Sequence, residues 1–229
     1  MKKITFFLVV VLIIIGSIAV YFFSKKNTVF SSIITAPVVP TQNIAANNDL
    51  PKPVPVVEVK PAIFINPIGN AVSRITKKKF GTKVSPTNSP VPNERFTGFH
   101  TGVDFEMLDK SELTKDIEIR AVCTGPLRQK KWVSGYGGLV VQECTLNGKS
   151  VSVVYGHFNI ASVTMAVGTL LEQGQHIGIL GTAYSKQTDG ERKHLHLGFY
   201  NGAPADIRGY VPTKAGLAKW IDPCTYICK

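Results

Sequence analysis

The chain has 229 residues, 44% of them hydrophobic, and a net charge of +11 at pH 7. Such a basic chain favours anionic partners, among them wall polymers and phospholipid head groups. Nucleic acid would also suit the charge, but no nucleic-acid-binding motif accompanies it, so we expect no such partner. The densest basic cluster, Lys77–Lys79, is either part of a binding surface or a solvated face without a specific partner.

The first predicted element is an uncharged, mostly apolar run from Ile4 to Phe23. Its length of about twenty residues suffices to span a hydrocarbon core at about 1.5 Å per residue. A cleavable signal peptide is the alternative, with a weak cleavage motif at Ser17–Ala19, but the apolar run continues beyond that motif. We therefore expect a transmembrane signal anchor over residues 1–26. Lysines flank the run on both sides, so the positive-inside rule leaves its orientation open.

Residues 27–61 have the composition of a disordered tether. Prolines recur along the segment, residues 43–48 are rich in Asn and Ala, and no aromatic residue lies between Phe30 and Phe64. Such a segment buries too little apolar surface to fold, and at roughly 5–6 Å × √n it would hold the next domain about 30 Å from a membrane. The remaining residues, 62–229, are enough for one domain with its own core.

Short β-rich runs separated by Gly and Pro dominate residues 62–229. This spacing predicts an all-β fold, an antiparallel sandwich or barrel-like domain with little helix. The Asn147-Gly148 pair between two valine-rich runs is a strong hairpin signal, and it places His157 at the end of the second hairpin strand. Only residues 213–220 have a helical pattern. The predicted strands are 117–122, 139–143, 150–155, 177–180 and 194–200.

The four cysteines are an even number, which favours disulfides in an exported protein. Three pairings are possible. Cys123 and Cys144 flank two predicted neighbouring strands, whereas Cys224 and Cys228 lie close together near the C-terminus. We therefore expect two disulfides, Cys123–Cys144 and Cys224–Cys228. The alternative is a four-cysteine zinc site, although the chain lacks the usual Cys-x-x-Cys pairs.

Two short patterns, His100-Thr-Gly-Val-Asp104 and His194-Leu-His196, have the spacing of metal ligands, and Tyr155-Gly-His157 lies between them. Neutral imidazole is the commonest metal ligand, and two imidazoles with one carboxylate form a donor set that zinc uses in catalytic sites. A structural zinc site would normally add cysteines and close all four positions. The patterns therefore indicate a zinc site with one position open for water.

His100 and Asp104 need a bend in the chain to reach one ion. On an ideal strand they would lie roughly 13 Å apart at about 3.3 Å per residue, whereas zinc–ligand bonds are about 2 Å long. We expect the bend at Gly102, because a residue without Cβ turns freely. A helix would also bring the two residues together, but Gly102 and its β-branched neighbours disfavour one.

His194 and His196 point to the same face of the predicted strand 193–200, and the two leucines that alternate with them point to the opposite face. A single histidine is more often a core or surface residue than a ligand, and we assign no chemistry to His176. The His-x-His pair gains weight from the His-x-x-x-Asp pattern upstream and from His157 between two glycine-rich strands.

These patterns resemble the lysostaphin-type (LytM-like) zinc peptidases that cut peptidoglycan, which carry His-x-x-x-Asp, Tyr-x-His and His-Leu-His in this order. The likeness covers about residues 64–223. Residues 95–105 resemble the first metal segment of that family and residues 136–141 its Tyr-Gly strand. Residues 174–181 resemble its Gly-Gln-x-Ile-Gly turn, and residues 220–223 the sequence that often closes the domain.

The resemblance implies that His100, Asp104 and His196 hold one zinc ion. It also implies that His157 and His194 flank the metal-bound water without being ligands, and imidazoles suit that place because they exchange protons near pH 7. Their individual roles stay open.

Tyr155 is a further candidate catalytic residue, because its hydroxyl could donate a hydrogen bond to the oxyanion. Packing of its ring on the strand is an equal alternative.

The function that the resemblance implies is a monomeric zinc endopeptidase acting on peptidoglycan stems or cross-bridges. The alternative is a non-catalytic wall-binding or amidase-activating module of the same fold. Either function places the domain outside the membrane, in the cell envelope, or in the medium if the leader is cleaved. Residues 182–193 form a longer and more charged loop than in many relatives, which leaves open the peptide bond that is cut.

Overall fold

The computed structural model describes residues 64–229. They belong to the unit of the chain that spans residues 57–229. The expected anchor over residues 1–26 and the expected tether over residues 27–61 lie outside the described residues, so both stay predictions. Within residues 64–229, no helix is both long and apolar enough to cross a membrane.

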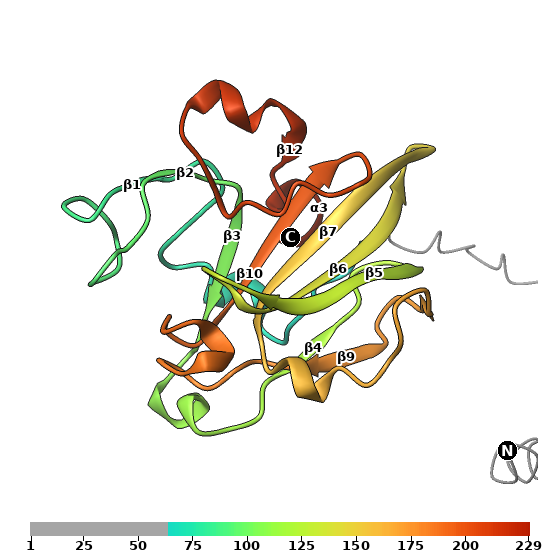
Figure 1. Ribbon diagram of the computed structural model, residues 1–229, viewed down its shortest axis with the longest axis horizontal. Helices are drawn as coiled ribbons and strands as arrows, with labels where there is room; N and C mark the ends of the chain where they lie inside the picture. Colours follow the sequence, from blue (N-terminus) through green and yellow to red (C-terminus); the bar gives the residue numbers. More distant parts are fainter. Residues whose placement is uncertain (1–63) are drawn as a thin grey trace, which may run out of the picture. The chain divides into compact units, whose positions relative to one another are not determined.

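A seven-stranded antiparallel sheet forms the largest part of the fold (Figure 1). Strand β10 pairs with β7 along one edge, and along its other edge it pairs first with β3 and then with β12. The order β12-β10-β7-β6-β5-β8 ends at β8 without closing into a barrel within the described residues. The strands are β3 (Gly102–Glu106), β5 (Gly125–Val133), β6 (Gly137–Leu146), β7 (Lys149–Phe158), β8 (Leu170–Leu171), β10 (His194–Asn201) and β12 (Trp220–Ile221).

Two smaller sheets and a few short helices complete the described residues, so the fold is mostly β with little helix, as predicted. The first small sheet joins β1 (Lys83–Val84), β2 (Gly98–His100) and β11 (Tyr210–Val211), and the second joins β4 (Glu118–Arg120) and β9 (His176–Ile179). The predicted helix at 213–220 is a 3-10 helix, η4 (Lys214–Lys219). The other helices are α2 (Ala71–Arg74), η1 (Lys110–Leu113), η2 (Ile160–Ser162), η3 (Lys186–Thr188) and α3 (Cys224–Ile227).

The predicted hairpin is present between β6 and β7. Asn147 and Gly148 have φ values of 50° and 74°, and two successive positive φ values are what a two-residue type I′ turn requires. Pairing starts next to the turn, where Leu146 lies opposite Lys149, and continues along both strands. The hairpin thus sets the register that carries His157 to the far end of β7.

Strand β10 separates the core from the face that carries the histidines. Leu195, Leu197 and Phe199 are fully buried in the main hydrophobic core. His194 and His196 alternate with them and therefore project from the opposite face. This is the alternation predicted for residues 193–200, and it lets one strand serve the core and the candidate site together.

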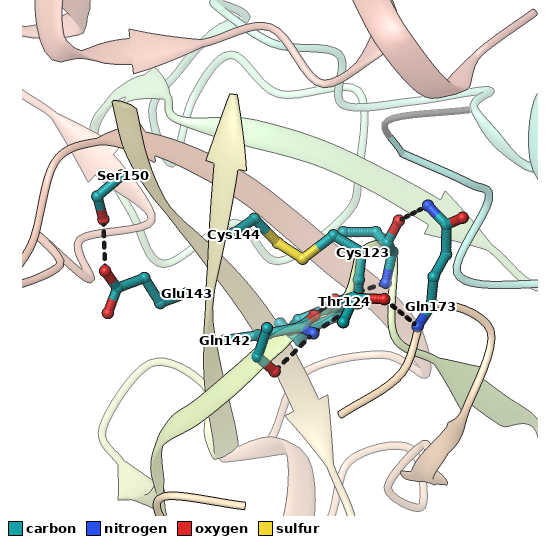
Figure 2. The surroundings of a disulfide bond; sticks show 10 residues. Cys123, Thr124, Gln142, Glu143, Cys144, Ser150 and Gln173 are labelled. Atoms are coloured by element: carbon teal, nitrogen blue, oxygen red, sulfur yellow. Dashed lines mark hydrogen bonds between the residues drawn. A yellow bond between two sulfur atoms is a disulfide. The ribbon is translucent and has the colours of Figure 1, made fainter. Parts of the chain in front are cut away.

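Both predicted disulfides are confirmed, and all four cysteines are used. The bridge Cys123–Cys144 connects β6 to the segment that leads into β5, and Figure 2 shows the side chains that surround it. The amide of Gln142 donates to the carbonyl oxygen of Cys123 at 2.8 Å. The bridge Cys224–Cys228 lies at α3. The alternative of a four-cysteine metal site is therefore wrong.

Candidate metal centre

The register of the central sheet brings the first two ligand candidates together. Strand β10 lies between β3 and β7, and His196 is directly opposite Asp104 on β3 and Gly156 on β7. Residues opposite each other point to the same face of a sheet, so Asp104 and His196 project together. Gly156 leaves room on its side, because a Cβ there would lie 2.4 Å from the ring of Tyr136.

A break between β2 and β3 brings His100 to the same place. The break falls at Thr101, whose hydroxyl donates to the carbonyl oxygen of Arg208 at 2.7 Å. The expected bend is thus present, one residue before Gly102. Gly102 itself has another role, because a Cβ there would lie 2.3 Å from the carbonyl oxygen of Leu197 on β10. Its missing side chain permits the close pairing of β3 with β10.

The donor atoms of His100, Asp104 and His196 form a small triangle. His100 Nε2 lies 2.9 Å from His196 Nδ1 and 3.2 Å from Asp104 Oδ1, and His196 Nδ1 lies 3.3 Å from Asp104 Oδ1. Ligands of a tetrahedral ion with bonds of about 2.0–2.1 Å are themselves about 3.3 Å apart. The three side chains are buried. The residues therefore fit one zinc ion with a fourth position left over.

In each histidine of the triangle, the ring nitrogen that does not face the other ligand candidates contacts a polar group of the protein. His100 Nδ1 lies 3.2 Å from the carbonyl oxygen of Lys79, which can only accept, so Nδ1 carries the proton and Nε2 keeps its lone pair. His196 Nε2 lies 3.4 Å from the hydroxyl of Tyr136, which leaves Nδ1 for the metal. Such contacts orient the imidazoles of metal sites. Burial also lowers the pKa of His196 to about 4, so its ring is neutral at pH 7.

Asp104 is held in the same manner by a residue that the sequence did not single out. Arg192 donates to Asp104 Oδ2 at 2.8 Å and binds both carboxylate oxygens of Glu106, so Oδ1 of Asp104 remains for the metal. Burial raises the pKa of Asp104, but electrostatic interactions and hydrogen bonds with His100 and His194 outweigh burial and hold that pKa well below its usual range. Asp104 is therefore an ionised ligand candidate.

His194 lies beside the triangle and outside it. Its Nδ1 lies 2.9 Å from the carbonyl oxygen of Arg192, so Nδ1 carries the proton, and its Nε2 lies 3.4 Å from Asp104 Oδ2. The rings of His194 and His157 are 4.2 Å apart between centroids. The structure thus brings all five predicted residues, His100, Asp104, His157, His194 and His196, to one place.

A β-bulge is the reason why His157 faces this site. The register between β6 and β7 shifts at Gly138, so His157 is an additional residue without an opposite partner, and its φ is 69°. In a regular strand it would share the core-facing side with Tyr155, two residues earlier. His157 Nδ1 is buried and has no hydrogen-bond partner among the described residues. Burial, aided by the electrostatic effect of the neighbouring His194, holds the pKa of His157 well below its usual range, so its ring is neutral.

The interpretation of Tyr155 as a catalytic donor is corrected by the structure. Its side chain is fully buried in the core, and its hydroxyl accepts from the backbone N–H of Val122 at 3.0 Å and donates to Gln142 at 2.8 Å. The tyrosine that does face the site is Tyr136, which the sequence showed only as part of a Tyr-Gly strand. Burial raises the pKa of Tyr136, so its hydroxyl keeps the proton and can donate it.

Two of the ligand candidates, Asp104 and His196, line a cleft of about 380 Å³, together with His157 and His194. One wall is the turn between β5 and β6, a second is the segment 207–210, and a third is formed by Glu191 and Arg192. Phe96, Val133 and Ile207 supply apolar surface to the lining. The cleft thus has a volume within the usual range of ligand sites and offers both polar and apolar contacts.

The predicted basic cluster Lys77–Lys79 is only partly a solvated surface. Lys78 is 1% exposed, and its ammonium binds Glu94 at 2.5 Å and the hydroxyl of Tyr210 at 2.7 Å. The carbonyl oxygen of Lys78 accepts the N–H of Asp104, and that of Lys79 faces His100. Backbone carbonyl groups of the cluster therefore help to position two of the ligand candidates, Asp104 and His100.

Residues 98–207 match the family model of peptidase family M23. The matched range contains the three ligand candidates together with Tyr136, His157, Arg192 and His194. No curated protein matches the chain.

Several solved structures are similar to the chain at low identity. Helicobacter pylori Csd3 is 22% identical, with 72% of this chain and 35% of that chain covered and a TM-score of 0.42. LytU is 20% identical, with 65% and 87% covered and a TM-score of 0.42. A protein named cbpa from L. salivarius REN is 21% identical, with 65% and 82% covered and a TM-score of 0.40. The chain thus spans about a third of the length of Csd3.

Proposed function

Because the chain belongs to peptidase family M23, we propose that it is a zinc-dependent endopeptidase that hydrolyses peptide bonds in peptidoglycan stems or cross-bridges. The observation that supports this function best is the triangle of His100, Asp104 and His196 donor atoms beside two further histidines in one cleft. A non-catalytic wall-binding module would not need His157 and His194, and the site retains both.

The three ligand candidates would hold zinc, which when bound supplies a Lewis acid and makes water acidic enough to react near pH 7. His157 and His194 lie beside the ligands, and a neutral imidazole can accept the proton that water loses and pass it to the leaving amine. The hydroxyl of Tyr136 donates a hydrogen bond to the carbonyl oxygen of the scissile bond as negative charge develops there. Arg192 keeps Asp104 in its orientation.

The experiment is digestion of purified peptidoglycans of known cross-link chemistry, with mass analysis of the fragments. We expect one zinc per chain, cleavage that stops with chelator and returns with zinc, and loss of cleavage without loss of zinc in His157→Ala and in His194→Ala. His176→Ala is the matched control, because His176 is exposed on β9 away from the site, and it should keep full activity. Unchanged cleavage by His157→Ala and His194→Ala would contradict the mechanism.

We further propose that the domain works in the cell envelope as a monomer, held to a membrane by residues 1–26 and spaced from it by residues 27–61. The two disulfides support an oxidising compartment. N-terminal sequencing of the mature protein from membrane and medium fractions is the test. A mature chain that begins after Ala19 would contradict the anchor and would instead support secretion of the domain after cleavage of the leader.

A further inference from the structure

A second cavity of about 710 Å³ adjoins the cleft of the metal centre. Glu191 and Arg192 line both hollows, so they form the boundary between them. The loop 182–193, in which the chain departs from many relatives, contributes Tyr184 and residues 190–193 to the second cavity. The end of β3, helix η1 and residues 91–95 supply much of the remaining lining.

The second cavity is lined by acidic and basic side chains, and the acidic ones already have hydrogen-bond or ion-pair partners. Its three carboxylates already have partners: Glu106 is bound by Arg192, Glu191 by Arg95, and Asp109 accepts two backbone N–H groups at the start of η1. Five basic side chains line the same cavity, and they are Lys77, Arg95, Lys110, Arg192 and Lys193.

Two of these basic groups remain available to a ligand. Lys110 is exposed and forms no ion pair within the described residues. Lys77 has a side chain that is 40% exposed, and its single ion pair is a 3.8 Å contact to Glu106, a carboxylate that Arg192 already binds. The basic side chains of the second cavity thus outnumber its carboxylates by five to three, and Lys110 has no carboxylate partner within the described residues.

Apolar surface accompanies this charge. Leu113 and Tyr184 line the second cavity and are 43% and 73% exposed, and Met107 lies in the same lining. A ligand that fits the cavity has a carboxylate for the lysines and an aliphatic portion for these side chains. A stem peptide with an acidic residue combines both, because its carboxylate lies beside methylene groups.

We infer that the second cavity is a subsite for a carboxylate-bearing portion of the stem peptide, recognised by Lys77 and Lys110. This inference rests on the proposed function, because it places the scissile bond at the metal centre and the carboxylate beyond the Glu191–Arg192 boundary. It adds the substrate class: a stem peptide with a free carboxylate is preferred over the same peptide with a carboxamide.

The test compares two synthetic cross-linked stem peptides that differ only in that group, with the zinc-loaded full chain as enzyme. We expect kcat/KM to be about tenfold higher for the carboxylate peptide, the ratio that corresponds to about 1.4 kcal/mol for a charge-assisted contact. In the Lys77→Gln/Lys110→Gln double variant this ratio should fall to about one. The control Lys214→Gln/Lys219→Gln removes the same charge on η4 and should keep the wild-type ratio.

A second arm measures binding without cleavage, by calorimetry of both peptides with the zinc-loaded His194→Ala variant. A lower Kd for the carboxylate peptide that disappears on adding Lys77→Gln/Lys110→Gln supports the subsite. Equal Kd values for the two peptides overturn it, and so does a preference that survives the double variant. If wild type cleaves neither peptide while the binding preference is present, the proposed function fails and the subsite stands. Displacement of the carboxylate peptide by inorganic phosphate at equal concentration would overturn the assignment in favour of a phosphate-bearing wall polymer.

Discussion

Removing the hydroxyl of Tyr136 should lower activity with little effect on stability. Removing the hydroxyl of Tyr155 should lower stability with little effect on activity. Tyr136→Phe keeps the ring that packs on Leu139 and Val154 and removes the oxygen that faces the metal centre. The hydrogen bond of that oxygen within the described residues is a 3.4 Å contact to His196, so the free energy of unfolding should fall by less than about 1 kcal/mol. Loss of an oxyanion donor lowers kcat by about 100- to 1,000-fold, roughly 2.7–4 kcal/mol, and we expect a decrease of that size.

Tyr155→Phe is the matched variant in the core. Its hydroxyl serves the N–H of Val122 at 3.0 Å and the side chain of Gln142 at 2.8 Å, and both groups are buried. Removing the hydroxyl leaves a donor and an acceptor unpaired, at a cost of about 1–3 kcal/mol each, so we expect about 2–6 kcal/mol less stability. The value of kcat should stay within about twofold of wild type at temperatures well below unfolding, because Tyr155 does not reach the cleft.

The assays are steady-state cleavage of a defined stem peptide, urea unfolding followed by circular dichroism, and zinc content of each variant. Zinc content should equal that of wild type in both. A wild-type kcat for Tyr136→Phe would refute its role as a donor. A Tyr155→Phe protein of unchanged stability with kcat reduced 100-fold would refute the assignment of Tyr155 to the core.

Three further outcomes are expected. Replacing Cys123 and Cys144 by Ala should lower the free energy of unfolding by about 3 kcal/mol in urea, from the entropy of a 21-residue loop, and loss of the four-residue C-terminal bridge should cost only about 2 kcal/mol. In metal-free protein His196 has a pKa of about 4 when folded and about 6.5 when unfolded, so the unfolded state binds more protons between these values. Stability should thus fall by on the order of 3 kcal/mol as pH decreases from about 6.5 to about 4, and a flat profile would contradict this. Gly102→Ala puts a Cβ 2.3 Å from a carbonyl oxygen of β10, so the free energy of unfolding should fall by about 1–3 kcal/mol. Zinc binding should also weaken, as measured by competition with a chelator. Gly69→Ala, with open space around the Cβ, should change neither property.

Local patterns were enough to predict much of the fold. The alternation in residues 194–200 predicted β10 and its two faces, and Asn147-Gly148 predicted the hairpin. Strand β5 was missed because most of its side chains are partly or fully exposed and several are charged, so it has no apolar alternation to detect. The two-residue strands were missed because they are too short to show a period.

Some residues of the site were predictable from the sequence, and others became apparent only from the structure. Spacing and resemblance predicted five side chains that the structure brings together, four of them in the lining of the cleft. The choice between Tyr155 and Tyr136 was not predictable, because both precede a glycine near a strand end, and only the packing tells that one hydroxyl lies in the core. Arg192 was not predictable either, since its partner Glu106 lies on β3, 86 residues earlier in the chain.

The sequence by itself determined the four histidines and the aspartate of the site, since the ligand spacings, the strand alternation and the hairpin turn are all properties of neighbouring residues. The tertiary structure decided where those groups point. The break at Thr101 folds His100 back toward Asp104, and the bulge at His157 turns its ring from the core side to the cleft. Both depend on strand register, which is set by hydrogen bonds and close contacts between segments far apart in the chain.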